Sequence, residues 1–341
     1  MDQVILLFGG KSEERLVSVA SAQNLAEQYD FSELIFQDKN ERLFRVAKPD
    51  LLNHKNVFLE EFIPNSTAVA ENLETGLELF KEKIVFLGWH GSFGENGQIQ
   101  KLFEQARIFF TGSGSAASKA AFEKDLAKSI IADAGLKMPE QLKFKTSQLE
   151  KVSAHLIQFL ARYKKIVIKP IGSGSSYGLH IVSSAEQLTT AIKKILDDQF
   201  ENYLVENFVS GRELTVGVIQ QENELISLPP SEIIVNEGSA FDYEGKYLGT
   251  GSQEITPAEL TSEEFEAAQK MALDAHIALG CYGYSRTDMI LTNEGPYFLE
   301  TNTLPGLSKP SFIPQQLLAA DIAFKSFITA QIKLASLRYL E

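Results

Sequence analysis

A predicted β-hairpin between residues 286 and 302 constrains this chain more than any other segment. Met289–Leu291 and Tyr297–Leu299 are short apolar runs, and Thr292–Gly295 between them has the composition of a turn. The apolar residues of both runs are typical of a hairpin that packs against a core. The polar residues at the two ends of the hairpin are therefore expected at defined positions on one sheet.

Four polar side chains are expected to share one face of this hairpin. If the chain turns near Glu294, Asp288 lies opposite Glu300. The same register places Arg286 opposite Asn302. Alternate residues of a strand share a face, and opposed side chains lie roughly 5 Å apart at Cβ. Two carboxylates and an amide oxygen at that spacing can bind one or two hard cations, and an arginine beside them can bind a phosphate. The alternative is a solvated polar face on a surface hairpin.

The size and composition of the chain are those of a soluble globular protein. Its 341 residues favour two or three domains, with 44% hydrophobic and 23% charged residues. No apolar run approaches the roughly 20 residues that span a bilayer. The first residues, MDQVILLFGG, contain no basic cluster and predict a first β-strand, in contrast to a signal peptide.

The charge balance and the single cysteine restrict the possible functions and the cellular compartment. The net charge of -13 argues against a general nucleic-acid or membrane-surface role, because both need a broad basic patch. It leaves room for a nucleotide ligand, since a small anion needs only a few local cations and backbone N–H groups. The single cysteine, Cys281, excludes internal disulfides, fits a reducing compartment and is interpreted as a core residue.

The first third of the chain alternates between predicted strands and helices. Val4–Phe8 is a strand that leads through Gly9-Gly10 into a helical stretch at Ser18–Gln28. A second apolar run, Ile84–Leu87, leads to Trp89-His90-Gly91. This alternation predicts a parallel sheet, whose ligand-binding edge lies at the carboxyl ends of its strands. Both glycine-containing turns are expected at that edge.

A glycine- and serine-rich loop joins two predicted strands in the middle of the chain. The strands are Lys165–Lys169 and Leu179–Val182, and residues 170–178 form the loop. Its flexible backbone can fold over phosphates while Lys169 supplies a point charge. The alternative is an ordinary turn, which is what most loops of this composition are.

Other segments of the middle and last thirds also have a predicted structure. The predicted helices are residues 119–134, 185–196, 261–279 and 321–339, and the further predicted strands are residues 203–206 and 211–219. Thr261 or Ser262 is expected to cap the third of these helices. The chain shows no internal repeat and no low-complexity segment.

Two loops of the last third carry polar groups that a ligand can use. Asp242–Tyr247 lies within the glycine-punctuated loop Phe241–Gly251, which is either a lid or an ordinary long loop. As a lid, it would bring Lys246 and Tyr247 to the ligand. Pro305–Phe312 precedes a helix, and its hydroxyl and N–H groups can hold a carboxylate.

Several single residues are candidates for ligand binding, and each has an ordinary alternative. Glu14 lies at a helix N-terminus, where it can orient an ammonium group or simply complement the helix dipole. His90 is a ligand-site residue or a structural histidine. Lys124 is a phosphate-binding lysine or a solvated surface residue. Glu206 and Glu213 can accept hydrogen bonds from a purine amino group or ribose hydroxyls, or they lie at an exposed strand end.

The order of these motifs along the chain resembles the D-alanine–D-alanine ligases of the ATP-grasp superfamily. The resemblance runs from GGKSEERLVS through HGSFGENG, KPIGSGSSYG, DYEGKY and RTDMIL to ETNTLPGLSKPS, which covers nearly the whole chain. It implies an α/β (α+β) ATP-grasp fold. The implied parts are an N-terminal parallel-sheet preATP-grasp domain at 1–113, a central β-rich nucleotide-clamping domain at 114–207, and a C-terminal ATP-grasp domain at 208–341 with a lid loop at 241–255.

The resemblance implies roles for the residues around the first D-alanine. Glu14 is expected to contact its ammonium group and to link through hydrogen bonds to Ser175 and Tyr247, which positions the lid. His90 is expected near the same substrate. Arg286 is expected to stabilise an acyl-phosphate and the tetrahedral intermediate that follows it.

The same resemblance implies the nucleotide, metal and second-substrate sites. The expected nucleotide-binding residues are Lys124, Lys169, Ser176, Glu206, Phe208, Val209 and Glu213. The expected ligands of two Mg²⁺ (or Mn²⁺) ions are Asp288, Glu300 and Asn302. Lys246 is expected to approach the γ-phosphate from the lid, and the N–H of Gly306 to complete an oxyanion site. Ser311 and Phe312 are expected to border the second D-alanine, with Ser311 at its carboxylate.

The implied activity is ATP-dependent ligation of two D-alanine molecules through an acyl-phosphate, for peptidoglycan precursor synthesis. The alternatives are a related ligase that joins D-alanine to D-lactate or D-serine, and a nucleotide-binding regulatory protein that has lost turnover. Tyr247 looks like the D-alanine–D-alanine type. The resemblance also implies a cytoplasmic homodimer whose partners are small molecules, with no nucleic acid and no membrane.

The chain departs from the common pattern of the family in four places. They are Asn96 in HGSFGENG, Tyr177 in the serine loop, Gly249-Thr250-Gly251 in the lid, and Leu307–Pro310 before the last motif. These departures bear on the geometry of the second substrate and on the rate of loop closure.

Overall fold

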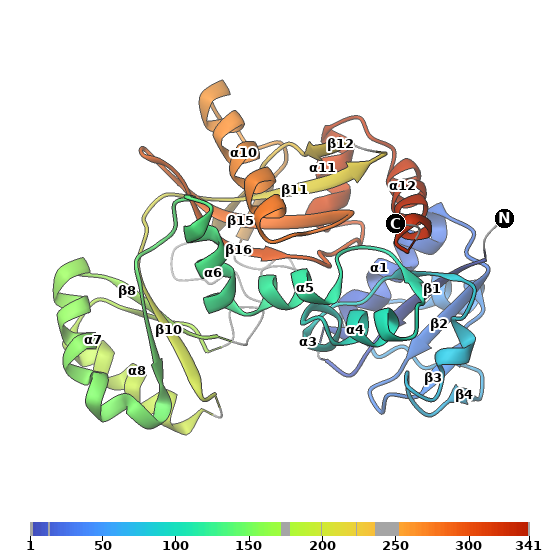
Figure 1. Cartoon of the computed structure of the whole chain (residues 1–341), viewed down its shortest axis with the longest axis horizontal. Coiled ribbons are helices and arrows are strands. Elements are labelled where there is room, and N and C mark those ends of the chain that lie inside the picture. The colour runs from blue at the N-terminus through green and yellow to red at the C-terminus, as the bar shows by residue number, and fades with distance from the viewer. Residues whose placement is uncertain are drawn as a thin grey trace.

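Among the residues that the computed structural model describes, three β-sheets are present, each with its own helices (Figure 1). The structure describes residues 3–12, 14–171, 178–198, 200–222, 224–235 and 252–339. In Figure 1 the first and second sheets lie at opposite ends of the molecule, and the third sheet lies between them. The mixed α/β architecture agrees with the expected class.

The first sheet is parallel at its centre, as the alternation of strands and helices predicts. Its strands, in order across the sheet, are β4 (Ala68–Ala70), β3 (Leu43–Arg45), β2 (Glu33–Gln37), β1 (Val4–Gly9), β5 (Ile84–Leu87) and β6 (Phe109–Phe110). β1 pairs in parallel with β2 and β5, and all of its residues are buried, which is typical of a parallel sheet covered on both faces. Its helical elements are α1 (Arg15–Gln28), α2 (Lys48–Asn53), η1 (Leu77–Leu79), α3 (Ser92–Glu95) and α4 (Gln98–Gln105).

The two glycine-containing turns meet at the carboxyl edge of this sheet. Gly10 follows β1 with a φ of 109°, a conformation that L side chains rarely adopt. A Cβ on Gly10 would lie 2.6 Å from the ring of Trp89, which follows β5. Glycine is therefore needed at this position, because it lets the two turns lie directly against each other.

Two helices connect the first sheet to the second. α5 (Ser115–Phe122) and α6 (Lys124–Asp133) replace the single helix predicted across residues 119–134, so that prediction was wrong in its continuity. The break lies at Glu123, whose ψ of 98° is extended. Local helix propensity is high on both sides of the break, and both helices pack against β16 of the third sheet. Tertiary contacts of this kind can override local propensity.

The second sheet is antiparallel and carries two long helices. Its strands, in order, are β7 (Gln141–Lys145), β10 (Asn202–Asn207), β8 (Ile166–Pro170) and β9 (His180–Val182). Its helical elements are η2 (Thr146–Gln148), α7 (Leu149–Tyr163) and α8 (Ala185–Asp197). β8 and β9 are the strands predicted on either side of the glycine- and serine-rich loop, and they pair antiparallel as that prediction requires.

The third sheet contains the predicted hairpin. Its strands, in order, are β14 (Ser252–Ile255), β13 (Ser231–Val235), β11 (Arg212–Gln221), β15 (Tyr284–Thr292) and β16 (Gly295–Asn302), and β12 (Glu224–Ser227) pairs with β11. Its helices are α10 (Ser262–Ala278), α11 (Phe312–Ala319) and α12 (Phe324–Leu337). Thr261 caps α10 in a capping box with Glu264, which decides between the two predicted N-caps.

The register of the β15–β16 hairpin is the predicted one for its polar residues. Asp288 pairs with Glu300, and Arg286 pairs with Asn302. All four residues are half-buried, whereas their neighbours Thr287 and Thr301 are buried on the opposite face. The four polar side chains therefore share one face of the sheet.

A β-bulge is needed to reach this register. Thr292 pairs with Gly295, so the turn has two residues, and a regular ladder from this turn would pair Asp288 with Leu299. The ladder instead shifts between Asp288 and Met289, which leaves Leu299 unpaired and brings Glu300 opposite Asp288. A one-residue shift moves every following side chain to the other face, so the bulge decides whether the two carboxylates meet.

The chain returns to the first sheet at its carboxyl end. α12 packs against β5 and β6, and Figure 1 shows it beside the N-terminal region. Arg338, just beyond α12, donates a hydrogen bond to the carbonyl of Phe110 at 3.1 Å and another to the carbonyl of Gly112. Its guanidinium also lies 3.8 Å from the centroid of the Phe110 ring. These contacts join the last helix to the first sheet.

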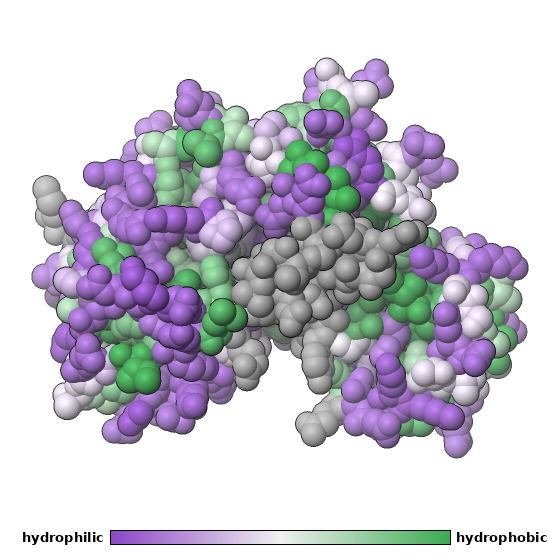
Figure 2. Space-filling model, turned by 180° about the vertical axis from the view of Figure 1, so that it is seen from behind, coloured by the Kyte–Doolittle hydropathy of each residue, from purple (hydrophilic) through white to green (hydrophobic). Residues whose placement is uncertain are grey.

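Hydrophilic residues cover most of the face shown in Figure 2, and hydrophobic ones form small groups between them. The described large apolar side chains with the greatest exposure include Ile63, in the segment before β4, and Leu318, on α11. Within the described ranges, no helix combines the length and the apolar character needed to cross a bilayer.

Arg338→Met is expected to lower the thermal unfolding midpoint, because it leaves two carbonyl acceptors of buried residues without their donor. Hydrogen bonds to a charged group are worth about 1.5–3 kcal/mol, so a loss of ~2 kcal/mol or more is expected. Lys333→Met on α12 is the control, since Lys333 is 63% exposed and its ion pair with Glu222 contributes little. Equal midpoints in the two variants would contradict the role of Arg338.

Candidate active site

The polar face of the β15–β16 hairpin holds a carboxylate pair with cations around it. Nε and Nη2 of Arg286 donate to the two oxygens of Asp288, each at 3.0 Å. The hydroxyl of Thr215, on β11, also donates to Asp288. Oε2 of Glu300 lies 3.7 Å from Nζ of Lys124. Because Asp288 and Glu300 are direct cross-strand neighbours, these contacts offset the repulsion between two like charges.

Asp288, Glu300 and Asn302 form a donor set that suits Mg²⁺. This cation takes oxygen ligands and is usually held by one or two carboxylates, with water and substrate phosphates completing its shell. Oδ1 of Asn302 accepts a hydrogen bond from the N–H of Leu304 at 2.8 Å, and its second lone pair remains for another partner. No group of three His, Cys, Asp or Glu side chains within the described ranges is placed to hold a metal, so water or phosphate oxygens would complete the shell.

Three lysines converge between α6 and β8. Nζ of Lys128 lies 2.7 Å from one carboxylate oxygen of Glu206, and Nζ of Lys169 lies 2.8 Å from the other. Lys124, one helical turn before Lys128, reaches Glu300. Three ammonium groups therefore face two carboxylates, and the excess positive charge favours an anionic ligand.

Burial sets the ionisation of this cluster. Burial lowers the pKa of Lys124, and it lowers the pKa of Lys128 to about 8, although neighbouring carboxylates oppose the shift in both. Burial alone would raise the pKa of Glu206, but Lys169 and Lys128 together bring it below its ordinary value. Glu206 is only 3% exposed, so the alternative of an exposed strand end is wrong for this residue.

The other residues expected around the nucleotide lie where the second and third sheets meet. Nζ of Lys165 lies 3.6 Å from the ring centroid of Phe208, which follows β10. Val209 lines a cavity of about 440 Å³ between the end of β10 and the tip of the β15–β16 hairpin. Glu213 lies on β11, where it pairs with Ile290 of β15.

His90 and Glu95 bring the edge of the first sheet to the hairpin. Nδ2 of Asn302 donates to Oε1 of Glu95 at 3.5 Å, and the same oxygen lies 3.9 Å from Nδ1 of His90. Burial, with help from Glu14, raises the pKa of Glu95 to about 8, and burial lowers the pKa of His90 to about 4. Both shifts disfavour the charged forms, so burial acts against an ion pair between these two groups.

Glu14 lies at the same edge. It precedes α1, and a Cβ on Gly91 would lie 2.8 Å from its carboxylate oxygen and 2.3 Å from Oγ of Ser12. The carboxylate of Glu14 therefore packs on the turn that follows β5. Its charge also raises the pKa of Glu95.

The loop between β16 and α11 brings Gly306 next to the expected second-substrate residues. A Cβ on Gly306 would lie 2.6 Å from Oγ of Ser311. The hydroxyls of Ser308 and Ser311 hydrogen-bond at 2.7 Å. The guanidinium of Arg286 lies 5.6 Å from the ring centroid of Phe312, the first residue of α11. Arg286, Gly306, Ser311 and Phe312 thus lie together.

Some predicted residues fall outside the described ranges. They are Ser175, Ser176, Lys246 and Tyr247, together with the departures at Tyr177 and Gly249-Thr250-Gly251 and most of the predicted lid. Asn96 is described, and its Oδ1 accepts a hydrogen bond from the N–H of Gln98 at 3.1 Å. It therefore orders the turn between α3 and α4.

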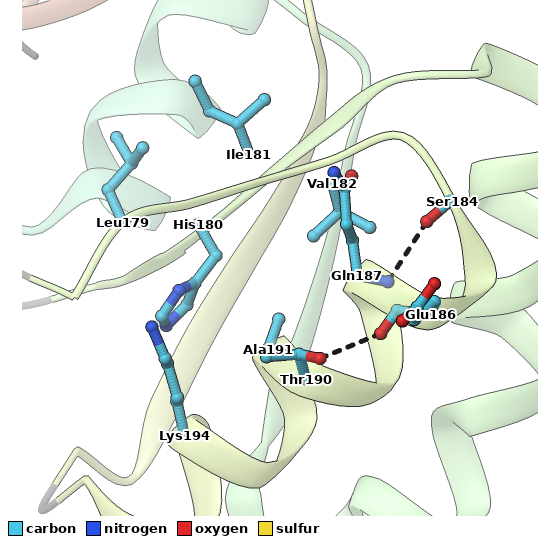
Figure 3. A pocket seen from close by; sticks show the side chains of 10 residues that line it. All are labelled: Leu179, His180, Ile181, Val182, Ser184, Glu186, Gln187, Thr190, Ala191 and Lys194. Carbon is cyan, nitrogen blue, oxygen red and sulfur yellow. Dashed lines mark hydrogen bonds between the residues drawn. The ribbon is translucent and has the colours of Figure 1, made fainter. Parts of the chain in front are cut away.

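A further cavity, of about 540 Å³, lies between β9 and α8 (Figure 3). In Figure 3 the side chains of His180 and Lys194 lie close together beside it. Its described lining residues include none of those predicted for the site. Among the described residues, the candidate active site and this cavity share no lining residue.

Comparisons with known proteins cover the whole length of the chain. The family models described as D-ala D-ala ligase N-terminus and C-terminus match residues 3–113 and 130–333. A D-alanine–D-alanine ligase from Leptospira interrogans serovar Lai is 33% identical, and the match covers 100% of both chains. Another, from Halalkalibacterium halodurans, is 30% identical over 98% of this chain and 99% of the relative. This chain belongs to the D-alanine–D-alanine ligase family.

Solved structures of similar ligases have the same fold. The VanG D-Ala:D-Ser ligase from Enterococcus faecalis is 29% identical, with a TM-score of 0.83 over 98% of this chain and 99% of that one. The D-alanyl-alanine synthetase A from Vibrio cholerae is 26% identical, with a TM-score of 0.79 over the same shares. The expected ATP-grasp fold is confirmed.

Two residues of the candidate site were not predicted from the sequence. Lys128 lies four residues after Lys124, and this helical spacing is a signal that could have found it. Glu95 lies in the HGSFGENG motif, but its contact with Asn302 spans 207 residues and cannot be read from local sequence.

Glu206→Gln and Lys128→Met are each expected to lower the thermal unfolding midpoint of this ligase, because each leaves a buried charge poorly compensated. Removing one partner of a buried pair typically costs about 3–5 kcal/mol. The double variant should lose less than the sum of the two, with a coupling of ~1 kcal/mol or more. The exposed pair Arg162–Glu140, 67% and 60% exposed, is the matched control and should show almost no coupling. Additive losses at Lys128 and Glu206 would contradict their direct pairing.

His90 predicts a loss of stability in acid. Its pKa is about 4 in the folded protein against an ordinary 6.5, so the unfolded chain binds a proton that the folded chain does not. The free energy of unfolding is therefore undiminished by His90 above pH 6.5 and decreases as the pH falls toward 4. His90→Gln should reduce the acid-induced loss of the free energy of unfolding by up to ~3 kcal/mol. The midpoint measured against pH should then fall less steeply in acid. His276, whose pKa is also about 4, should supply the residual slope. Equal slopes in both proteins would refute the assignment.

Proposed function

We propose that this protein uses ATP to join two molecules of D-alanine into D-alanyl-D-alanine for peptidoglycan precursor synthesis. The observation that carries the proposal is the position of the Asp288–Glu300 pair in a chain of this ligase family. On one side the pair meets a buried cluster with excess positive charge, through Lys124. On the other side it meets Arg286 and, through Asn302, the loop that contains Gly306.

The lysine side would hold the nucleotide. Lys124 and Lys169 would bind its phosphates. Glu206 pairs with Lys128 and Lys169 and would keep those two ammonium groups in place. The expected contacts to the rest of the nucleotide are Ser176, Glu206, Phe208, Val209 and Glu213. Lys246 would approach the γ-phosphate from the lid.

Asp288, Glu300 and Asn302 would hold Mg²⁺ or Mn²⁺. Two divalent cations bound there would supply Lewis-acid neutralisation of the charge on the phosphate oxygens. The bonds from Arg286 and Thr215 leave Asp288 oriented along the hairpin face before any ligand arrives.

The first step would activate the carboxylate of the first D-alanine. A carboxylate is a poor electrophile, so its oxygen attacks the γ-phosphorus of ATP, the bond to ADP breaks, and an acyl-phosphate forms. Glu14 would hold the ammonium group of this substrate, with Ser175 and Tyr247 beside it, and His90 would border it. Arg286 would neutralise the charge on the transferred group.

The second step would form the peptide bond. The deprotonated amine of the second D-alanine attacks the acyl carbon, a C–N bond forms, and phosphate leaves as the C–O bond breaks. Arg286 and the N–H of Gly306 would stabilise the oxyanion of the tetrahedral intermediate. Ser311, at the N-terminus of α11, would bind the carboxylate of this substrate, with Phe312 beside it. Closure of the lid and the serine loop would exclude water, which would otherwise hydrolyse the acyl-phosphate.

The proposal includes the organisation of the whole protein. Domain boundaries near residues 113 and 207 follow the division into three sheets. The lid would span residues 241–255. The working form would be a cytoplasmic homodimer with small-molecule partners, without nucleic acid or membrane.

Phosphate release from ATP is expected to require both D-alanine and Mg²⁺. Asp288→Asn should lower kcat by roughly 10²–10³-fold, because one carboxylate of the cation-binding face loses its charge. Glu224→Gln, on strand β12 of the same sheet, is the control and should leave kcat unchanged, since Glu224 is exposed. D-alanine-dependent turnover that needs no divalent cation would overturn the proposed metal role.

The identity of the product shows which second substrate the protein joins to D-alanine. With D-alanine, D-serine and D-lactate offered together, mass spectrometry should show mainly D-alanyl-D-alanine. The similarity to a D-Ala:D-Ser ligase makes D-serine the acceptor to compare most closely. A dominant mixed product would assign the alternative ligation, and a folded protein without any D-alanine-dependent turnover would favour a regulatory role.

A further inference from the structure

One face of helix α1, which packs on the first sheet, binds the loop that contains Gly306. Ser21 and Asn24 are three residues apart on this helix and share a face. Oγ of Ser21 accepts a hydrogen bond from the N–H of Leu307 at 3.2 Å, and Nδ2 of Asn24 donates one to the carbonyl of Leu307 at 2.8 Å. Both backbone groups of the residue that follows Gly306 are therefore bound by α1.

His90 extends this network to the other side of Gly306. Its Nδ1 lies 3.0 Å from the carbonyl of Leu304, and its Nε2 lies 2.9 Å from Oγ of Ser21. A carbonyl only accepts, so Nδ1 carries the proton and Nε2 accepts from the hydroxyl of Ser21. The chain of donors runs from Leu307 through Ser21 and His90 to Leu304. The two ends of this hydrogen-bond chain, at Leu304 and Leu307, lie on either side of Gly306. Both ring nitrogens of His90 have a partner in it.

Burial shows which contacts of this face matter most. Glu27, three residues after Asn24, pairs with Lys309 at 2.6 Å, but the two side chains are 37% and 67% exposed. An ion pair so open to solvent contributes little. Ser21 is fully buried and Asn24 is 6% exposed, so loss of either would leave a buried backbone group without a partner. Ser21 and Asn24 are therefore the main contacts between α1 and the loop.

We infer that Ser21 and Asn24 are positioning residues that fix the direction of the Gly306 N–H for the second step of the ligation. The inference rests on the proposed function. Gly306 has no side chain, so the direction of its N–H is set by the neighbouring peptide groups. Helix α1 binds the N–H of the next peptide group and the carbonyl of the one after it. Small misplacement of a positioned group can cost ~10²-fold in rate.

Asn24→Leu tests this inference, because leucine fills a similar volume without the donor. Dipeptide formation is expected to fall by about 10–100-fold in kcat, while the KM for ATP stays the same. Positional isotope exchange of ATP in the presence of D-alanine, which reports the first step, is expected to stay close to the original rate. Ser21→Ala should show the same pattern, and Ser21→Thr, which keeps the hydroxyl, should restore dipeptide formation.

Gln23→Leu is the matched control on the same helix. Nε2 of Gln23 donates to the carbonyls of Leu51 and His54, both at 2.8 Å, so this variant loses similar bonds away from the Gly306 loop. It should leave the ratio of the two steps unchanged. If Asn24→Leu slows both steps equally, or behaves like Gln23→Leu, the inference is overturned.

Amide hydrogen exchange separates this inference from the proposed function. Asn24→Leu should speed exchange in the peptide that spans residues 303–311, and Gln23→Leu should speed it near residues 51–54. Unchanged exchange in residues 303–311 of Asn24→Leu would overturn the inference, whatever the activity. Absence of D-alanine-dependent turnover in the unaltered protein would instead overturn the proposed function.

Discussion

Two carboxylates that repel each other organise the centre of this molecule. Asp288 and Glu300 are held face to face by the hairpin ladder, and like charges directly opposed across a ladder destabilise it. Each is met by a cation from a different direction: Arg286 comes from the same strand and Lys124 from helix α6. One helical turn farther along α6, Lys128 pairs with a further carboxylate, that of Glu206. Toward the first sheet, by contrast, burial shifts the pKa values of His90 and Glu95 toward their neutral forms.

Much of the fold could be predicted from local pattern. The central strands of the first sheet, the strands around the serine-rich loop and the cap of α10 at Thr261 all follow from periodicity and end signals that act within a few residues. The break at Glu123 could not be predicted, because the residues on both sides favour a helix. The same limit applies to the bulge at Leu299, whose neighbours look like an ordinary strand.

The candidate site shows the same division between local and distant information. The pairing of Asp288 with Glu300 was predictable because both residues belong to one hairpin, although the predicted turn reached it without the bulge that the structure requires. Lys128 could have been inferred from its spacing to a lysine already considered. The bond from Asn24 to Leu307 could not, since it joins residues 283 positions apart that only the assembled sheets bring together.

The return of the last helix to the first sheet has a consequence for synthesis of the chain on the ribosome. Translation completes the first sheet before the second and third, but the surface of β5 and β6 that α12 covers stays uncovered until α12 emerges. Ala335 and Phe327, which complete buried clusters with first-sheet residues, are made only after all three sheets. The nascent protein must therefore carry an open apolar surface while the second and third sheets are made, and such surfaces are where chaperones bind and where chains aggregate. A truncated product would keep that surface exposed for its whole lifetime.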